Sequence, residues 1–140
     1  MIKSLVCINI VSNNNDCARG KITIANFNEF FEIALDWWKI DDYVTQWQAG
    51  LERLEKHKKS CLVASINNPH KKPYINWWLL YKENGKIYAQ NQIIVEDIYQ
   101  EIIGNKSFTP EICYNFIPPR ETHDEDGEEI AEWFVGEEEI

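Results

Sequence analysis

The sequence of 140 residues lacks any apolar run approaching the about 20 residues that a helix needs to cross a bilayer. It also lacks an export signal, because the apolar run after Lys3 is short, contains Asn9, and ends in an Asn-rich turn without a small-residue cleavage site. We therefore expect a cytoplasmic protein that does not bind membranes.

Paired cysteines are missing as well. The chain has four cysteines, Cys7, Cys17, Cys61 and Cys113, and none belongs to a Cys-x-x-Cys pair. Zinc knuckles and redox motifs use such close pairs, so this spacing speaks against both. In a chain of this size the dispersed cysteines predict buried, reduced thiols in a reducing compartment.

Residues arranged for catalysis are also scarce. The chain contains three histidines, and it has neither a Gly-x-Ser-x-Gly elbow nor a glycine-rich phosphate loop. Its C-terminal carboxylates are crowded and expected to be exposed, whereas catalytic carboxylates are retuned in apolar clefts. We expect no catalytic residue, no cofactor and no enzymatic activity. Because sites can assemble from distant residues, a small hydrolase or nuclease stays open as an alternative.

The segment from Thr122 to Gly127 resembles a metal site. His123 and Asp124 are possible ligands, and the turn looks like a calcium-binding loop. The register fails, because with Gly127 as the sixth position the twelfth is Trp133, where such loops carry Glu. We expect a solvated Asp-Gly turn that holds no metal.

What the sequence does have is charge of one sign at one end. From Arg120 onward ten acidic residues accompany a single base, so this segment carries the whole net charge of −9, and the first 119 residues are neutral overall. A one-sided field favours a positively charged partner and disfavours nucleic acid or an anionic membrane as the direct ligand. On charge alone, the alternative is a solubilising tail.

Aromatic residues are plentiful, with six each of Trp, Tyr and Phe. Apolar residues make up 44% and charged residues 26% of the chain, which is ordinary for a globular protein. No repeat or low-complexity linker interrupts the chain, so we expect one domain over residues 1–140. Most of the large rings should fill its core, and some could anchor an interface.

The N-terminal half predicts strands followed by a helix. β-Branched residues on both sides of the Asn-rich turn at 13–15 favour a hairpin over 3–25. The run 27–38 alternates as a strand does, but its apolar residues also fall on one helical face. We expect a strand there, because a helix start signal comes only with the two aspartates at 41–42. From that signal an apolar stripe and a lysine-rich end predict a helix over 41–58.

The rest of the chain predicts short strands and small helices. Asn84-Gly85 between apolar runs is a strong hairpin signal, and it joins strands expected at 75–82 and 86–92. The other expected elements are a strand at 60–66, a short helix at 96–103, a turn or helix from Thr109, a strand at 112–117, and a hairpin turn at Asp126-Gly127 that leads into 130–135. We therefore expect an α+β fold: a mostly antiparallel sheet with one long helix, about 41–58, packed on it and one or two short helices.

Two tandem tryptophan pairs, Trp37-Trp38 and Trp77-Trp78, fall in the expected strands. Adjacent residues of a strand face opposite sides of the sheet. One Trp of each pair could therefore lie in the core while the other points outward or under a helix. The alternative is that both pairs are buried in a sheet covered on two sides.

Several short segments between about residues 30 and 135 form a recognisable pattern. They are Leu35-Asp36-Trp37-Trp38, Asp41-Asp42-Tyr43, Gln46-Trp47, Gly50-Leu51-Glu52-Arg53-Leu54, Ser60-Cys61-Leu62-Val63, Trp77-Trp78 with Leu80-Tyr81, Gln90-Asn91, Phe116-Ile117-Pro118-Pro119-Arg120-Glu121-Thr122, Glu125-Asp126-Gly127 and Glu132-Trp133. In these segments the chain resembles the immunity proteins of contact-dependent growth inhibition systems, the CdiI family. The turn at 13–15 and residues 136–140 fall outside the pattern.

This resemblance implies a protein made beside a large secreted effector whose C-terminal toxin domain enters neighbouring cells. The immunity protein binds that domain in the cytosol and neutralises it by blocking its active site or substrate surface. Many such toxins are nucleases, which tend to be basic, so the implied partner is a basic, nuclease-type toxin domain bound 1:1. A small hydrolase or a structural adaptor subunit is the alternative function.

The docking hypothesis combines the charge with the aromatic pairs. Complementary charge speeds the association of two proteins, so the acidic turn is expected to contact the basic toxin. An ordinary interface buries about 1,600 Å² in total, more than one hairpin covers, so aromatic anchors are expected as well. The residues predicted to bind the toxin are Asp124, Glu125, Asp126, Glu128, Glu129, Trp38 and Trp78.

Overall fold

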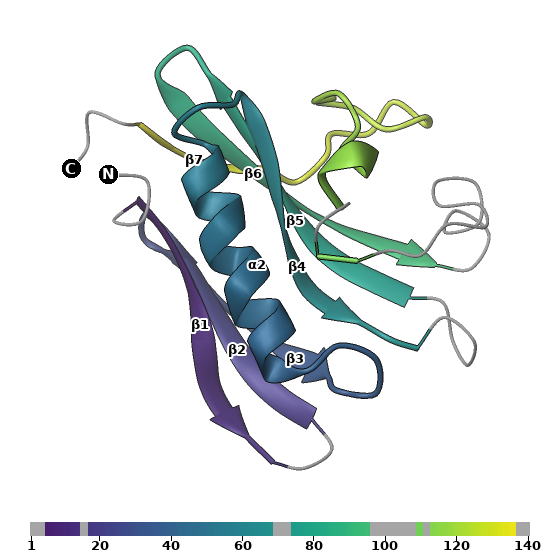
Figure 1. Ribbon diagram of the computed structural model, residues 1–140. Coiled ribbons are helices and arrows are strands. Elements are labelled where there is room, and N and C mark those ends of the chain that lie inside the picture. The colour runs from purple at the N-terminus through teal and green to yellow at the C-terminus, as the bar shows by residue number, and fades with distance from the viewer. Residues whose placement is uncertain (1–4, 15–16, 69–73, 96–108, 111–112, 137–140) are drawn as a thin grey trace.

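The computed structural model describes residues 5–14, 17–68, 74–95, 109–110 and 113–136, and in them the chain forms two antiparallel sheets and one long helix (Figure 1). Sheet A has the strand order β1 (Val6–Asn13), β2 (Cys17–Ile24), β3 (Phe27–Ala34). Sheet B has the order β4 (Lys59–Ile66), β5 (Tyr74–Glu83), β6 (Lys86–Val95), β7 (Trp133–Gly136). The long helix is α2 (Ile40–Arg53), and a 3-10 helix, η1 (Cys113–Phe116), lies between β6 and β7 in the chain.

The expected α+β class and antiparallel pairing are confirmed, although the strands form two sheets instead of one. The predicted N-terminal hairpin is the β1–β2 pair. The predicted hairpin at Asn84-Gly85 joins β5 to β6, and both turn residues have positive φ, 54° and 73°. Two positive φ values are the mark of a type I′ turn, whose twist matches that of the strands it joins.

Helix α2 begins near the predicted acidic pair but ends at Arg53 instead of residue 58. The Asp42 carboxylate accepts a hydrogen bond from the backbone N–H of Lys39 at 2.9 Å, which ties the first turn to the preceding residue. At the other end Leu54 is fully buried, and its backbone carbonyl accepts a hydrogen bond from the Lys82 side chain of β5. Tighter turns follow, so Lys56 and Lys58 lie in the connection to β4, Lys59 begins β4, and none of the three is on the helix.

Buried polar contacts fix α2 on β4. A β-bulge between Val63 and Ser65 interrupts the pairing of β4 with β5. Gln46 makes two hydrogen bonds with the backbone of Val63: its Nε2 donates to the carbonyl at 2.9 Å, and its Oε1 accepts from the N–H at 3.1 Å. Trp47 Nε1 donates to the same carbonyl at 2.7 Å. The helix therefore satisfies backbone groups that would otherwise be buried without partners.

Gly50 allows the closest approach of α2 to β4. A Cβ at this position would lie 2.6 Å from the backbone oxygen of Cys61 and 2.8 Å from Leu62 Cδ2. Ser60 Oγ also donates to the Gly50 carbonyl at 2.7 Å, so the helix cannot move away without breaking that bond. The absence of a side chain at this position is therefore a packing requirement.

We predict that Gly50→Ala lowers the free energy of unfolding by about 1–3 kcal/mol, the usual range for overpacking. Helix propensity alone would favour Ala over Gly by about 1 kcal/mol, so the two effects have opposite signs. Urea unfolding followed by tryptophan fluorescence measures the change, with Gln48→Ala on the exposed side of α2 as the control. A Gly50→Ala variant as stable as the wild type would show that α2 and β4 are packed less tightly.

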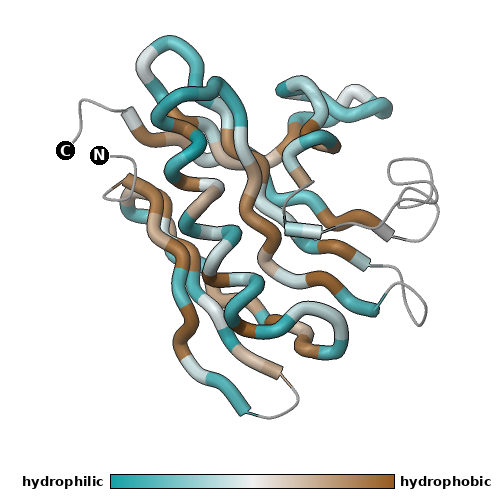
Figure 2. The backbone as a smooth tube through the Cα atoms, in the orientation of Figure 1, coloured by the Kyte–Doolittle hydropathy of each residue, from teal (hydrophilic) through white to brown (hydrophobic). Residues whose placement is uncertain are grey.

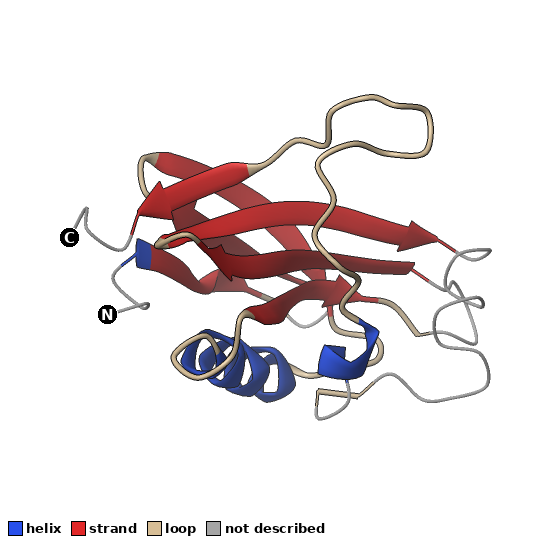
Figure 3. Ribbon diagram, turned by 90° about the horizontal axis from the view of Figure 1, so that it is seen from above, coloured by secondary structure: helices blue, strands red, loops and turns tan. Residues whose placement is uncertain are grey.

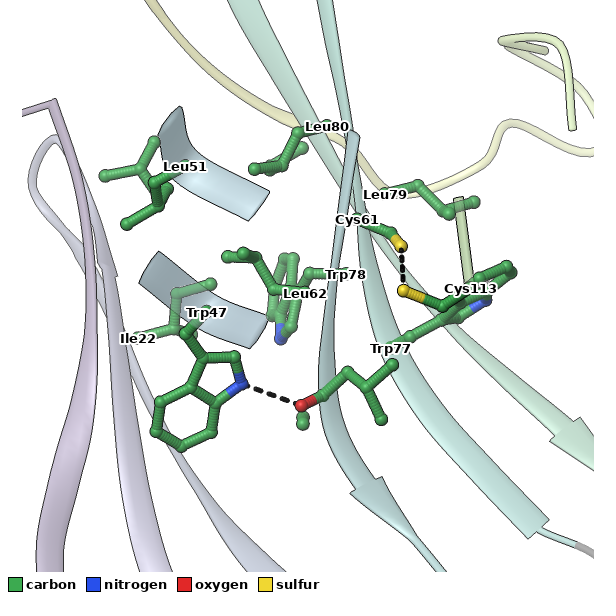
Figure 4. Close-up of a cluster of buried hydrophobic side chains, with 14 of the residues drawn as sticks. Ile22, Trp47, Leu51, Cys61, Leu62, Trp77, Trp78, Leu79, Leu80 and Cys113 are labelled. Atoms are coloured by element: carbon green, nitrogen blue, oxygen red, sulfur yellow. Dashed lines mark hydrogen bonds between the residues drawn. The ribbon is translucent and has the colours of Figure 1, made fainter. Parts of the chain in front are cut away.

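Sheet B is covered on both faces. Figure 4 shows Leu62, Trp78 and Leu80 on the side of α2, and Cys61 and Trp77 on the opposite side with Cys113 of η1. Trp77 and Trp78 are 0% and 1% exposed, so the alternative in which this pair lies in a sheet covered on two sides is confirmed.

The other tryptophan pair lies outside any strand. The strand predicted over 27–38 is present as β3, but it ends at Ala34, whose backbone N–H donates to Ser65 Oγ of β4 at 2.9 Å. The contact with sheet B ends the pairing with β2 and sends the chain toward α2. Trp37 and Trp38 therefore lie in the connection, where Trp38 packs edge-on against Tyr43 with ring centroids 5.3 Å apart.

Two further expectations differ from the structure, and a third concerns residues that the structure does not describe. The prediction of a strand at 112–117 is wrong for the described part of that segment, which contains η1 and packs against β4. Cys61 and Cys113 are buried with sulfur atoms 3.5 Å apart, but Cys7 and Cys17 are exposed on sheet A, so the prediction of buried thiols is wrong for those two. The short helix predicted at 96–103 lies outside the described residues.

Candidate functional site

The acidic residues predicted to bind a partner lie on one loop, residues 120–132, which we call the acidic loop. It runs between η1 and β7, and Figure 3 shows it projecting on the side of the molecule opposite α2. Figure 2 shows that it is one of the most hydrophilic parts of the described chain. The side chains at 121–129 are all exposed, so their charge is available to a partner.

Asp124 builds the turn at the tip of the acidic loop. Its Oδ1 accepts hydrogen bonds from the backbone N–H of Asp126 at 2.9 Å and of Glu128 at 3.0 Å. Gly127 follows with a φ of 81°, a conformation that favours glycine. A single β-bridge between His123 and Glu129 closes the turn, so the predicted hairpin is present in a minimal form. Asp124 therefore fixes the conformation of the loop and also adds to its negative charge.

Arg120 and Glu132 form an ion pair that joins the two ends of the acidic loop, and we call this pair the neck. Arg120 Nε lies 2.8 Å from Glu132 Oε2, and its Nη2 lies 2.5 Å from Oε1, which makes a bidentate ion pair. The two side chains are 18% and 16% exposed, so the pair is largely shielded from water. Arg120 Nη1 also donates to Glu83 Oε1 of β5 at 3.1 Å. The two ends of the loop are thus held together.

Strand β6 supports this neck. Gln90, which is 1% exposed, donates through Nε2 to Glu132 Oε2 and to the backbone carbonyl of Glu121, both at 2.8 Å. The Tyr88 ring lies under the Arg120 guanidinium, with 3.8 Å between Cζ and the ring centroid. The acidic loop is therefore joined to the sheet at both of its ends.

The ion pair is charged at neutral pH. Burial would raise the pKa of Glu132, but the hydrogen bonds from Arg120 and Gln90, with the charge of Arg120, lower it below its ordinary value of 4.5. The hydrogen bond to Glu132 likewise raises the pKa of Arg120. A lowered carboxylate pKa adds stability above the ordinary pKa, and that stability is lost as the pH falls through the lowered value. The neck should therefore stay closed throughout the neutral range.

The acidic loop forms a groove of about 460 Å³ with one residue each of β6 and β7, and it is lined by Tyr88, Thr122, His123, Glu129, Ile130, Ala131, Glu132 and Phe134. Phe134 is 53% exposed, whereas its neighbour Trp133 turns inward and stacks on Phe27 at 4.4 Å. Aromatic side chains are enriched at the centres of protein interfaces, and this exposed ring lines a groove that a partner could fill. The sequence prediction missed Phe134, although the alternation along 133–135 could have indicated it.

The predicted aromatic anchors are elsewhere and point inward. Trp38 is 4% exposed, and Trp78 is 1% exposed and packs against Phe27 and Trp133. The sequence left open which ring of each pair faces outward. Neither of these two rings does, because Tyr43 of α2 packs on the first and Phe27 of sheet A packs on the second. Trp37 is the exposed member of its pair, at 39%.

A second groove, of about 420 Å³, lies between β1 and α2 and has a different character. It is lined by Val6, Cys7, Ile8, Asn9, Ile10, Val44, Trp47, Gln48 and Leu51, none of which is acidic, basic or a histidine. Cys7 is the one side chain in this lining that could act as a nucleophile or general base, and the lining contains no histidine or carboxylate to activate it. Among the described residues, no group of three or more His, Cys, Asp or Glu side chains is placed to bind a metal ion, and none of the helices could span a bilayer.

Comparisons with known proteins point to one family. The immunity protein CdiI of Enterobacter cloacae subsp. cloacae is 38% identical over 115 residues, which are 81% of this chain and 75% of that protein. A solved structure described as a CdiA-CT/CdiI toxin and immunity complex from Enterobacter cloacae matches with a TM-score of 0.71 and 34% identity, over 91% of this chain and 85% of the matched chain.

A family model supports the same assignment. The model of the CdiI N-terminal domain matches residues 33–140. The matched region contains α2, all of sheet B and the acidic loop. The chain therefore belongs to the CdiI family of immunity proteins.

Proposed function

We propose that this chain binds the C-terminal toxin domain of a contact-dependent growth inhibition effector in the cytosol and neutralises it, with the acidic loop as part of the docking surface. The observation that carries the docking site is that the whole net charge of −9 lies from Arg120 onward, while Glu125, Asp126, Glu128 and Glu129 are exposed on a loop tied to sheet B. Immobilised charges are more useful to a partner than mobile ones, because less ordering is required on binding.

We propose that the toxin is a nuclease, as the resemblance to the family implies, and the negative charge of this chain agrees with that proposal. A nuclease active site is built to attract phosphates, and a rigid row of carboxylates offers that site similar charges. The immunity protein would then occupy the surface that nucleic acid uses. It would act by binding alone and would not need catalysis of its own.

The partner to test is the cognate toxin domain of this chain, the counterpart of the CdiA-CT toxin in the matched complex, and we call it CdiA-CT here. Co-expression should rescue bacterial growth from the toxin, and light scattering should show a 1:1 complex. The purified chain alone should not hydrolyse RNA or DNA. Failure to bind CdiA-CT would overturn the proposed function; turnover of nucleic acid by the free chain, or a stable homo-oligomer that ignores CdiA-CT, would support the alternatives instead.

Phe134 replaces Trp38 and Trp78 as our proposed aromatic anchor. We predict that Phe134→Ala weakens CdiA-CT binding by about 1–3 kcal/mol while the melting temperature changes little, because about half of Phe134 is already exposed to water. Isothermal titration calorimetry measures the affinity.

Phe30 provides a matched control. It is 48% exposed on β3 and has Arg19 over its ring at 4.5 Å, much as Phe134 has Lys86 at 4.7 Å. Phe30→Ala should leave the affinity unchanged. Equal losses in the two variants would contradict a specific anchor at Phe134.

A further inference from the structure

The neck of the acidic loop joins residues 12 positions apart, and this has a consequence for docking. Arg120 opens the loop, Glu132 ends it, and Gln90 of β6 donates both to Glu132 and to the carbonyl of Glu121. Within the loop, backbone hydrogen bonds also join its two sides: the N–H of Ile130 donates to the carbonyl of Thr122, and the N–H of Asp124 donates to the carbonyl of Glu128, both at 2.9 Å. Without the neck, the exposed tip would keep only these local bonds.

Arg120 is a poor candidate for a docking residue itself. Its side chain is 18% exposed, its guanidinium is engaged by Glu132 and Glu83, and one face lies on the Tyr88 ring. As a cation within an acidic loop, it would on charge alone oppose the attraction of a basic partner. Arg120 therefore contributes to the loop by holding its two ends in place, not by its charge.

We propose that Arg120 is a positioning residue: with Glu132 and Gln90 it forms a clasp that pre-orders the acidic loop, so that its carboxylates dock without first being ordered. The inference rests on the proposed function for the docking role, but the clasp itself is a property of the free chain. A bidentate guanidinium–carboxylate pair suits this task, because its two parallel bonds fix orientation as well as distance. Lysine has no such fork.

The clasp makes a prediction that charge alone cannot make. Arg120→Gln renders the chain more acidic, and Glu132→Gln renders it less acidic. If charge dominates, the first variant binds a basic CdiA-CT domain faster and the second binds it more slowly. If the clasp dominates, both variants lose affinity by about tenfold, and hydrogen exchange of the backbone amides at 122–130 becomes faster in both. Hydrogen–deuterium exchange of the free variants and surface plasmon resonance with CdiA-CT measure the two effects.

Two further variants separate positioning from simple destabilisation. The exchanged pair Arg120→Glu with Glu132→Arg keeps the net charge and should restore part of the loop protection and of the affinity, whereas Arg120→Lys should restore little. Arg53 serves as a matched control, because it also lies over an aromatic ring, Tyr114 at 4.5 Å, and bonds a backbone carbonyl. Arg53→Gln should lower the melting temperature without speeding exchange in the loop.

Opposite changes in affinity for Arg120→Gln and Glu132→Gln would overturn the clasp, as would unchanged loop exchange in both. Neutralising the tip carboxylates tests the docking site independently. If that variant binds CdiA-CT normally while Arg120→Gln still speeds loop exchange, the clasp orders the loop but has no docking role, and the second half of the proposal fails.

Discussion

Replacing Glu125, Asp126, Glu128 and Glu129 with their amides is expected to slow association with CdiA-CT by about tenfold or more at low salt. Electrostatic steering raises association rates by about 10–10³-fold, and these carboxylates are exposed on a single loop. Dissociation should change less, because charges at the rim of an interface act mainly on encounter. Stopped-flow or surface plasmon resonance measurements give both rates.

Salt provides an internal check on this expectation. The screening length falls from about 10 Å at 0.1 M to about 3 Å at 1 M ionic strength, so the wild-type advantage should shrink steeply as salt is added. In the variant with all four carboxylates replaced, the association rate should depend much less on the salt concentration. Asp124 is left in place because its carboxylate holds the turn through the N–H groups of Asp126 and Glu128.

The matched control removes the same number of acidic residues from sheet A, from α2 and from the turn that follows α2. Glu29, Glu32, Asp41 and Glu55 change to their amides, so that both variants have the same net charge. Association of this control should stay close to the wild-type rate. If both variants slow equally, only the net charge matters. If neither slows and both protect cells, the acidic loop is a solubilising segment and the toxin docks on the neutral part of the chain.

Trp47→Ala is expected to lower the free energy of unfolding by about 3–5 kcal/mol, the range for removal of a large aromatic residue from a core. Trp47 is 2% exposed, contacts Phe31 edge-on at 6.1 Å, and bonds the Val63 carbonyl at the β4 bulge (Figure 4). The variant loses both apolar contacts and a buried hydrogen bond. The melting temperature should fall by about 10 °C or more.

Trp37→Ala provides the control for this prediction. Trp37 is 39% exposed in the connection before α2, so its removal leaves no comparable cavity and should change the unfolding free energy by about 1 kcal/mol or less. Urea unfolding monitored by far-UV circular dichroism avoids dependence on the tryptophans themselves. Similar losses in the two variants would show that α2 is not held by Trp47.

Features with local causes could be predicted from the amino-acid sequence. The hairpin between β5 and β6 follows from Asn84-Gly85, because these two residues accept the positive φ values of the turn. The start of α2 follows from the aspartates at 41–42, since Asp42 reaches only three residues back to Lys39. The position of the net charge needs no structure at all. The family pattern likewise could be read directly from short segments.

Tertiary contacts decided where several elements end. Helical spacing continued beyond Arg53, but the burial of Leu54 and the bond from Lys82 turn the chain toward β4. Alternation continued beyond Ala34, but its bond to Ser65 ends β3. In both cases the contact comes from a segment 28 or 31 residues away, outside the reach of any local pattern.

Tertiary structure also decided which rings face a partner. Period-two alternation identifies the two faces of a strand but does not tell whether each face is covered. Sheet B is covered on both sides, so Trp77 and Trp78 are buried alike, whereas Phe134 at the β7 edge is exposed. The clasp has the same origin, since Gln90 and Glu132 are 42 residues apart in sequence. Exposure and long-range pairing depend on what the rest of the chain places nearby, and only the folded arrangement contains that information.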